Sequence, residues 1–304
     1  MNRFGGYDML ITEELRKPGV KRMILDTDTY NEIDDQFALA LAMLSPDRID
    51  LAAVTAAPFH NDRSESFGDG MEKSYREIGV CAGLVNRSHG AKIPPYYRGA
   101  TERMPDEHTP VPSEAAEKIA ELVNEYDGIT FVTAIGAVTN VASALLLHPE
   151  IREKAAVIWL GGNAKWFNGA EFNMLGDRNA SNALLSSGVP LLLFPCAGVV
   201  SHLDLSIYEL EHFLRGNSPL GDYLCDNVAE CEPRGAVAWS RVIWDISTVA
   251  GVVDPDTFSA SLCPAVRLEP DNSYTFDPDG VPFEHVDRVN RDRIFSVLFG
   301  RLAK

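Results

Sequence analysis

The stretch Met23-Ile24-Leu25-Asp26-Thr27-Asp28-Thr29-Tyr30-Asn31-Glu32-Ile33-Asp34-Asp35 joins a short apolar run to a cluster of five acidic side chains. Such a run is typical of a buried strand, which would carry the acids at its carboxyl end. Clustered carboxylates repel one another and lose hydration when buried, so a hard cation with oxygen ligands is the simplest compensation. The alternative is a solvated acidic loop in which one aspartate caps the next helix.

The composition is that of an ordinary globular protein with a strong acidic excess. Of 304 residues, 45% are hydrophobic and 23% charged, and the formal net charge is -17. This charge, with dispersed Lys and Arg, disfavours nucleic acid and anionic membranes as partners. No apolar stretch approaches the roughly 20 residues of a membrane-spanning helix. The N-terminus lacks the apolar core of a secretory signal, and the five cysteines form no CxxC pair, so we expect a cytoplasmic protein with reduced thiols.

Strand-like and helix-like segments alternate along the first two thirds of the chain. The expected strands are 21–25, 49–56, 129–134, 155–160 and 191–194, and the expected helices are 34–44, 64–78, 111–126, 139–147 and 179–187. This order predicts an α/β fold with an open, mostly parallel sheet flanked by helices. No linker interrupts it, so we expect a single domain over residues 1–304. The polar segment 264–282 is expected to be an insertion or a hairpin.

The carboxyl ends of the expected strands place several polar segments together. In parallel α/β sheets, ligands bind at this edge. The acidic loop and the segments 133–136 and 161–163 all fall there. The sequence therefore predicts a ligand site built around the acidic loop.

Three later segments complete a pattern with the acidic loop, which supplies an Asp-x-Asp pair and an Asp-Asp pair. They are Gly136-Ala137-Val138-Thr139-Asn140, Gly161-Gly162-Asn163 with Glu171-Phe172-Asn173, and Val242-Ile243-Trp244-Asp245. In this order the segments resemble the inosine/uridine-preferring nucleoside hydrolase family, which consists of calcium-dependent N-ribohydrolases on an open parallel α/β fold. Each motif is weak alone, whereas the four together are specific. The Asn-Glu-Ile-Asp-Asp version of the loop resembles that of one bacterial subgroup.

The resemblance implies a Ca²⁺ site. Asp28, Asp35 and Asp245 would be side-chain ligands, and Ile135 would contribute its main-chain carbonyl oxygen. Three carboxylates and a carbonyl suit a hard cation, with water and two sugar hydroxyls completing six to eight ligands. Taken alone, Asp245 is better explained as a helix N-cap. Asp26 is expected to orient the loop rather than bind metal.

The resemblance also assigns the catalytic step to Asp34, as the general base that removes a proton from water. The water would attack C1′ of the ribose through a transition state resembling an oxocarbenium ion. Negative carboxylates around the sugar would stabilise that developing positive charge. The products would be ribose and a free base.

Four residues are candidates for binding the substrate's sugar. Glu171 and Asn173 match family residues that hold ribose hydroxyls, and Asn61 is a weaker candidate. Asn163 could face the 5′ end of the sugar, although its spacing to Glu171 is unusual. Buried hydrogen-bonding groups of this kind would favour ribose over 2′-deoxyribose. A surface glutamate in a loop is the alternative for Glu171.

Two departures from the family concern the metal loop and the sugar site. The loop between Asp28 and Asp34 is two residues longer than usual, and the extra Asn31-Glu32 could reshape the metal loop or add a polar contact. Because the spacing after Asn163 is unusual, Lys165 and Asn168 compete with it for the sugar contact. These departures leave the metal-binding pattern intact.

Two further departures concern the departing base. Many family members have a His before the late Asp, where it can protonate the base, but here that residue is Trp244. Tryptophan can stack on a base but cannot act as an acid, and core packing is its alternative role. The possible acids His60, His108 and His202 have no motif support. The His-Gly-x-x-Gly-Leu segment of the family is absent, with residues 99–112 reading differently.

The leading hypothesis is a calcium-dependent ribonucleoside hydrolase that acts as a homodimer or homotetramer, as the resemblance implies. A hydrolase of a modified or nicotinamide-type riboside keeps the same mechanism. A non-catalytic protein that binds calcium or ribosides is the alternative from another class. An intact Asp34 favours catalysis over binding alone. A phosphatase-like use of the Asp-x-Asp pair is disfavoured by the later segments.

Overall fold

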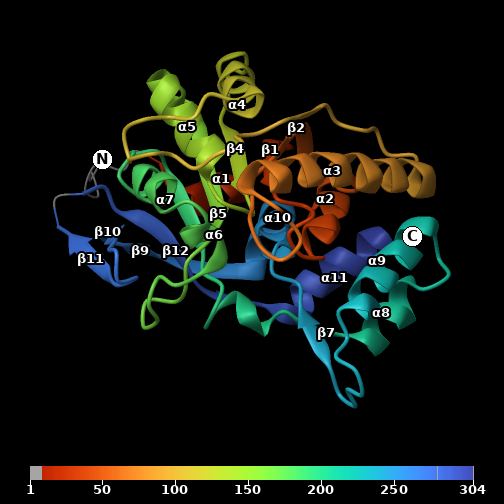
Figure 1. Ribbon diagram of the computed structural model, residues 1–304. Coiled ribbons are helices and arrows are strands. Elements are labelled where there is room, and N and C mark those ends of the chain that lie inside the picture. The colour runs from red at the N-terminus through yellow and green to blue at the C-terminus, as the bar shows by residue number, and fades with distance from the viewer. Residues whose placement is uncertain (1–8, 279, 304) are drawn as a thin grey trace.

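A computed structural model describes residues 9–278 and 280–303 of the chain. In these residues, the core is an eight-stranded sheet with the order β3-β2-β1-β4-β5-β6-β12-β9 (Figure 1). Neighbouring strands are parallel except β12 and β9, which are antiparallel. In sheet order the strands are β3 (Tyr96–Tyr97), β2 (Ile49–Ala56), β1 (Lys21–Thr27), β4 (Thr130–Ala134), β5 (Ala155–Leu160), β6 (Leu191–Phe194), β12 (Phe283–Val289) and β9 (Phe258–Cys263). The predicted open, mostly parallel α/β sheet is confirmed.

Helices cover both faces of the sheet because successive side chains of each strand point to opposite faces. Met23 and Leu25 of β1 pack into one apolar cluster, and Ile24 between them packs into the other. The first cluster includes α1 (Ile11–Arg16), α2 (Asp35–Met43), α3 (Phe67–His89), α8 (Ile207–Leu214), α9 (Pro219–Glu230), α10 (Ile246–Val253) and α11 (Arg291–Leu302). The second includes α4 (Glu114–Asn124), α5 (Thr139–Leu147) and α7 (Arg178–Leu185) (Figure 1).

The expected elements match the observed ones closely in the first two thirds of the chain. Residues 49–56, 139–147, 155–160 and 191–194 form β2, α5, β5 and β6 with the predicted bounds. The helix expected over 64–78 begins at Phe67, after the N-cap Ser66, and continues to His89. Its buried residues continue at helical spacing from Ile78 to Cys81, Ala82 and Val85, and the helix ends only at Gly90, whose left-handed backbone (φ 71°) forms the C-cap.

Smaller elements are attached to the main sheet. The segment expected to be an insertion or a hairpin forms the antiparallel pair β10 (Ala265–Leu268) and β11 (Tyr274–Asp277). A second short pair joins β7 (Asp204–Ser206) to β8 (Ser240–Val242), and α6 (Phe172–Gly176) lies after β5 in the chain. Within residues 9–278 and 280–303, no helix is long and apolar enough to cross a membrane. The single domain over residues 1–304 stays a prediction.

Candidate active site

The acidic loop after β1 is buried rather than solvated. The side chains of Asp26, Asp28, Asp34 and Asp35 are each at most 2% exposed, and Asp245 is 4% exposed. The solvated-loop alternative is therefore wrong. Because burial removes the hydration of a carboxylate, these side chains need compensating partners.

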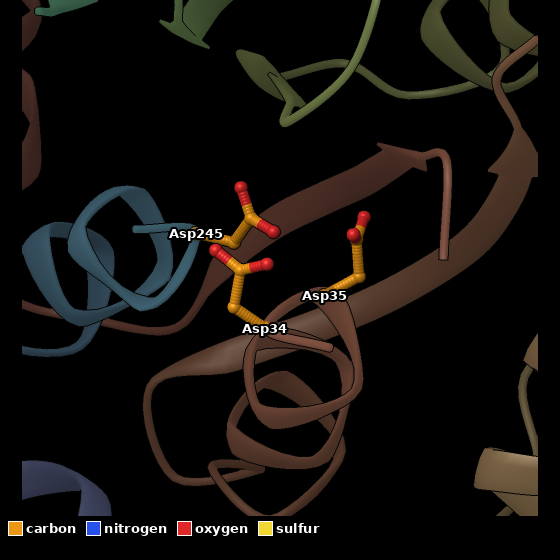
Figure 2. A group of neighbouring side chains, drawn as sticks. All are labelled: Asp34, Asp35 and Asp245. Atoms are coloured by element: carbon orange, nitrogen blue, oxygen red, sulfur yellow. The ribbon is translucent and has the colours of Figure 1, made fainter. Parts of the chain in front are cut away.

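Three of these carboxylates converge. One oxygen from each of Asp34, Asp35 and Asp245 lies within 4.8 Å of the others. Figure 2 shows Asp34 and Asp35 at the start of α2 and Asp245 at the start of α10, with all three side chains on the same side of the two helices. Asp34 and Asp245 occupy N-cap positions, but neither side chain makes a capping hydrogen bond. The N-cap role considered for Asp245 therefore leaves its carboxylate available for another contact.

The Asp28 carboxylate stands beside this group with no hydrogen-bond partner in the described residues. Both of its side-chain oxygens are buried and unpaired. Gly136 allows this placement, because a Cβ at that position would lie 2.9 Å from both Cγ and Oδ1 of Asp28. The Gly136 of the sequence pattern thus makes room for the carboxylate.

Burial is the largest cause of the raised pKa values in this cluster. It raises the pKa of Asp35 to about 7. The pKa values of Asp28, Asp34 and Asp245 lie well above their usual range, with burial acting first and neighbouring carboxylates adding to it. The side chains of Asp35 and Asp245 are also in hydrogen-bonding contact. Carboxyl groups this close need a shared proton or a cation.

The donor set fits a hard divalent cation. One cavity is surrounded by oxygen ligands. These are the two unpaired oxygens of Asp28, the clustered carboxylates of Asp34, Asp35 and Asp245, and the main-chain oxygen of Ile135. Hard cations such as Ca²⁺ prefer carboxylate and carbonyl oxygens. The arrangement can therefore hold such an ion.

Asp26 has different surroundings from the other acids. Its Oδ1 accepts hydrogen bonds from Thr55 Oγ1 at 2.6 Å and from Asn140 Nδ2 at 2.9 Å. Burial raises its pKa to about 6. Asn140 also donates to the main-chain oxygen of Ala56 at 3.1 Å and accepts from the Ala100 N–H. Asp26 thus connects the ends of β1 and β2 to α5.

A cavity of about 450 Å³ lies over the acids, in the size range of small-molecule sites. Its lining includes Asp28, Asn31, Glu32, Asp34, Asp35, Ile135, Asn163, Phe167, Asn168, Glu171, Phe172, Asn173, Cys196, Trp244 and Asp245. The expected metal ligands and the expected general base, Asp34, thus line one cavity. Of the four ribose candidates, Asn163, Glu171 and Asn173 are also among the lining residues.

Glu171 and Asn173 are held by main-chain groups as well as lining the cavity. The Glu171 carboxylate accepts hydrogen bonds from the N–H groups of Gly162, Asn173 and Met174 at 2.8–2.9 Å. Asn173 Nδ2 donates to the carbonyl oxygens of Ile135 at 3.2 Å and Leu160 at 3.0 Å. The Glu171 side chain therefore caps α6 in the wall of the cavity rather than standing free on the surface, and Asn173 contacts the carbonyl expected to be a metal ligand.

The other sugar candidates differ in their placement. The side chain of Asn163 bonds to three main-chain groups. Its Nδ2 donates to the carbonyl oxygens of Asn168 and Ala170, and its Oδ1 accepts from the N–H of Ala197. Asn61 does not line the cavity; its Nδ2 donates to Asn31 Oδ1 at 2.6 Å, and Asn31 does line it. Any effect of Asn61 on a ligand would therefore pass through Asn31.

Lys165 and Asn168 are the alternatives to Asn163 for the sugar contact, and only one of them lines the cavity. Lys165 Nζ binds Asp287 Oδ1 and Ser261 Oγ, each at 3.0 Å, and Lys165 does not line this cavity. Asn168 does line it. Asn168 is thus the better placed of the two.

Trp244 lies between the cavity and the core. It lines the cavity and also packs against the first apolar cluster. Its main-chain N–H donates to Asp34 Oδ2 at 2.9 Å. Both roles considered for Trp244, stacking and packing, are therefore compatible with its position.

Two further polar residues of the cavity wall bear on the site. Glu32, from the two-residue insertion considered for a polar contact, lines the cavity and forms an ion pair with Arg241. Cys196 lines it as well, and burial raises the pKa of its thiol. Cys196 follows the end of β6, so its place at the carboxyl edge of the sheet could have been predicted from the strand order.

The sequence from residue 23 to residue 277 matches the family model of the inosine-uridine preferring nucleoside hydrolases. The pyrimidine-specific ribonucleoside hydrolase RihA of Photobacterium profundum is 24% identical over 319 residues, covering 92% of this chain and 98% of that protein. RihA of Escherichia coli (strain K12) is 27% identical over 281 residues, covering 83% and 86%.

Solved structures of similar proteins share the fold. A plant nucleoside hydrolase superposes with a TM-score of 0.74 at 22% identity, covering 94% of this chain and 99% of the other. A purine-preferring ribonucleoside hydrolase from Gardnerella vaginalis gives a TM-score of 0.72 at 19% identity, covering 93% and 98%. The expected α/β architecture is therefore found in independent structures.

Proposed function

Because the chain belongs to the inosine-uridine preferring nucleoside hydrolase family, and is thus a hydrolase acting on N-glycosyl bonds, we propose that it cleaves ribonucleosides to ribose and free base with the help of Ca²⁺. The observation that carries this proposal is the convergence of Asp34, Asp35 and Asp245 within 4.8 Å, beside the unpaired carboxylate of Asp28. These acids lie under a cavity large enough for a nucleoside.

In this proposal Asp28, Asp35 and Asp245 hold the ion with their side chains, and Ile135 contributes its carbonyl oxygen. When bound, Ca²⁺ would neutralise part of the buried charge, orient the sugar hydroxyls and lower the pKa of water. The raised pKa values of these carboxylates support a cation as the missing partner.

Asp34 acts as the general base. The Trp244 N–H fixes one oxygen of its carboxylate, and burial together with the nearby Glu32 raises its pKa. A carboxylate with a raised pKa is a stronger proton acceptor. As water bonds to C1′, Asp34 takes its proton, and the electrons of the C1′–N bond leave with the base. The buried carboxylates stabilise the positive charge that develops on the sugar.

The sugar is recognised by the polar residues on the cavity floor and wall. Glu171 and Asn173 hold ribose hydroxyls, and Asn163 stands toward the 5′ end. Asn61 acts through Asn31, to which it is hydrogen-bonded. Because an unmatched buried polar group is costly, ribose is preferred to 2′-deoxyribose.

The base lies toward Trp244 and Glu32. No histidine is among the described residues that line this cavity, and an indole cannot donate a proton to the leaving nitrogen at neutral pH. Substrates whose base leaves without a strong acid are therefore favoured. The pyrimidine specificity named for the RihA relatives makes uridine and cytidine the first substrates to test.

Because no described residue that lines this cavity is a histidine, one specific alternative substrate fits the site. Nicotinamide leaves its riboside as a neutral molecule and needs no proton. A nicotinamide-type riboside therefore fits the same mechanism. A homodimeric or homotetrameric assembly completes the proposal and rests on the family resemblance. A cytoplasmic location rests on the reduced cysteines.

Reducing-sugar release tests the proposal directly. The substrates are uridine, cytidine, inosine, adenosine, nicotinamide riboside and p-nitrophenyl riboside, each with Ca²⁺ and with a chelator. We expect calcium-dependent release from at least one nucleoside. Release that is unaffected by the chelator would remove the metal from the mechanism, and no release from any riboside would contradict the hydrolase function.

A further inference from the structure

A second cavity of about 370 Å³ adjoins the one over the acids. Asn163, Phe167 and Asn168 line both cavities, so the segment that carries them forms the wall between the two. We call this second space the side cavity. None of the acidic-loop residues lines it.

The strand order places the side cavity on one particular end of the proposed active site. The active-site cavity extends from the loop after β1, which carries Glu32, to Cys196 after β6. The side cavity begins at Leu193 of β6 and continues to His285 of β12 and Cys263 of β9. Because the sheet order is β1-β4-β5-β6-β12-β9, the side cavity extends the site away from Glu32 and the acidic loop.

The side cavity is lined mainly by apolar side chains. Met174, Leu185, Leu193, Val266 and Phe283 are among its lining residues. At its rim, Trp166 is 72% exposed and Phe276 is 59% exposed. Large apolar side chains left exposed around a cavity are typical of a ligand site.

The polar residues of the side cavity carry little free charge. Lys165 is paired with Asp287 and bound to Ser261. His285 is buried, and burial lowers its pKa to about 4, so the imidazole is neutral at pH 7. A charged ligand group such as a phosphate would find no free charged partner among these groups, whereas an uncharged apolar group would match the walls.

The shape of a β-nucleoside indicates which part of the substrate would reach this space. Its base on C1′ and its C5′ group on C4′ project from the same face of the sugar, at opposite ends, and the 2′ and 3′ hydroxyls project from the other face. With the hydroxyls toward the buried acids and the base toward Trp244 and Glu32, C5′ is directed toward Asn163 and Phe167.

We propose that the side cavity receives an apolar substituent on C5′ of the riboside, such as an alkylthio or aryl group. The inference rests on the proposed function, because it uses the orientation of the sugar over the acids. It assigns a substrate class, the 5′-substituted ribosides, to a chain whose site would otherwise be expected to take only simple nucleosides.

Paired substrates test the inference. The pairs are 5′-deoxy-5′-methylthiouridine with 5′-deoxyuridine, and 5′-deoxy-5′-methylthioadenosine with 5′-deoxyadenosine. Each pair differs only in the apolar group, so base preference cancels. We expect kcat/KM to be about tenfold higher for the methylthio member, the size of a well-filled apolar contact. Isothermal titration of the same pairs into calcium-loaded Asp34→Asn protein measures the preference in Kd without turnover.

Val266→Trp would fill the side cavity. Val266 and Phe276 face each other across the β10–β11 hairpin and both line it, whereas the neighbouring Thr275 does not. We expect Val266→Trp to reduce the tenfold preference to about onefold to twofold while changing kcat/KM for the 5′-deoxy member by less than about threefold. Thr275→Trp, the matched control, keeps the parent's preference.

A milder variant guards against misfolding. Phe276→Ala removes an exposed wall of the side cavity and should lower the preference by about threefold. Equal kcat/KM and Kd within each pair, or a preference that survives both variants, would overturn the inference while leaving the proposed function standing. Failure to bind or cleave either member, together with inactivity on the unsubstituted ribosides, would contradict the proposed function itself.

Discussion

The main-chain N–H of Trp244 donates a hydrogen bond to Oδ2 of Asp34, with 2.9 Å between the two atoms, across 210 residues of sequence. The bond connects the start of α10 to the start of α2. Asp245 is the next residue, so the same turn presents a carboxylate to the acidic cluster. Because the donor is a backbone group, a change of the Trp244 side chain leaves the bond in place.

Trp244→Ala therefore separates stacking from positioning. We expect KM for the riboside to rise about tenfold, the scale of base–aromatic stacking, with kcat changed by less than about threefold. Steady-state kinetics and thermal denaturation check this prediction. Trp166→Ala is the control, since Trp166 lies at the side cavity and not at the acids. An unchanged KM with a lower Tm would assign Trp244 to core packing alone.

Asp245→Ala should lower calcium affinity and activity together. The carboxylate is buried within 4.8 Å of two others, so its loss removes a metal donor and also relieves repulsion. We expect at least about a tenfold loss in Ca²⁺ affinity and no decrease in the Tm of the metal-free protein. Calorimetric titration with Ca²⁺ measures the affinity of the parent and of the variant, and thermal denaturation measures their Tm. Asp292→Ala, at a side chain that is 92% exposed, is the control. Parent-like calcium binding would make the ligand assignment wrong.

The stabilisation by Ca²⁺ should increase with pH. Folded-state pKa values of about 6 for Asp26 and about 7 for Asp35 exceed the ordinary aspartate value near 4. The folded protein therefore binds protons that the unfolded chain has lost, and this contribution to metal-free stability declines as pH rises from about 4 to 7. Calcium requires deprotonated ligands. We expect a larger calcium-induced rise in Tm at pH 8 than at pH 5.5, and equal rises would contradict the account.

Gly136→Ala tests the space left for Asp28. The new Cβ would lie 2.9 Å from the Asp28 carboxylate and 3.1 Å from Ala57 Cβ, so Asp28 must move. We expect calcium affinity to fall about 10-fold to 100-fold, as for other changes that misplace a ligand. Gly83→Ala in α3 is the control, because its Cβ would meet only the end of Arg87, at 3.4 Å. Unaltered affinity in Gly136→Ala would remove Asp28 from the ligand set.

The sequence was sufficient to predict how the strands deliver the acids. Parallel strands end at one edge, so apolar runs followed by polar loops placed Asp28, Asp35 and Ile135 together before any contact was known. Local signals also marked most of the helices and strands between residues 21 and 194, whereas those of the last third were not predicted individually. The extension of α3 to His89 was missed although its buried residues keep the helical spacing beyond Ile78, at Cys81, Ala82 and Val85.

Contacts between distant loops could not be predicted in the same way. The Glu32–Arg241 ion pair joins residues 209 positions apart, and Arg241 belongs to no motif that would pair it with the acidic loop. The side cavity depends on how the β10–β11 hairpin packs beside β6 and β12, which the turn-forming residues of 264–282 do not specify. The ion pair and the side cavity could therefore not be predicted from the sequence.

The most direct test of the account compares binding and turnover in Asp34→Asn. The substitution keeps the size of the side chain and an oxygen that can accept the Trp244 N–H, but it removes the proton acceptor. With the best riboside of the substrate panel and saturating Ca²⁺, we predict a loss of kcat of about 100-fold to 10,000-fold, with the Kd of riboside and calcium within about threefold of the parent. Parent-like turnover would contradict the assignment of Asp34 as the general base.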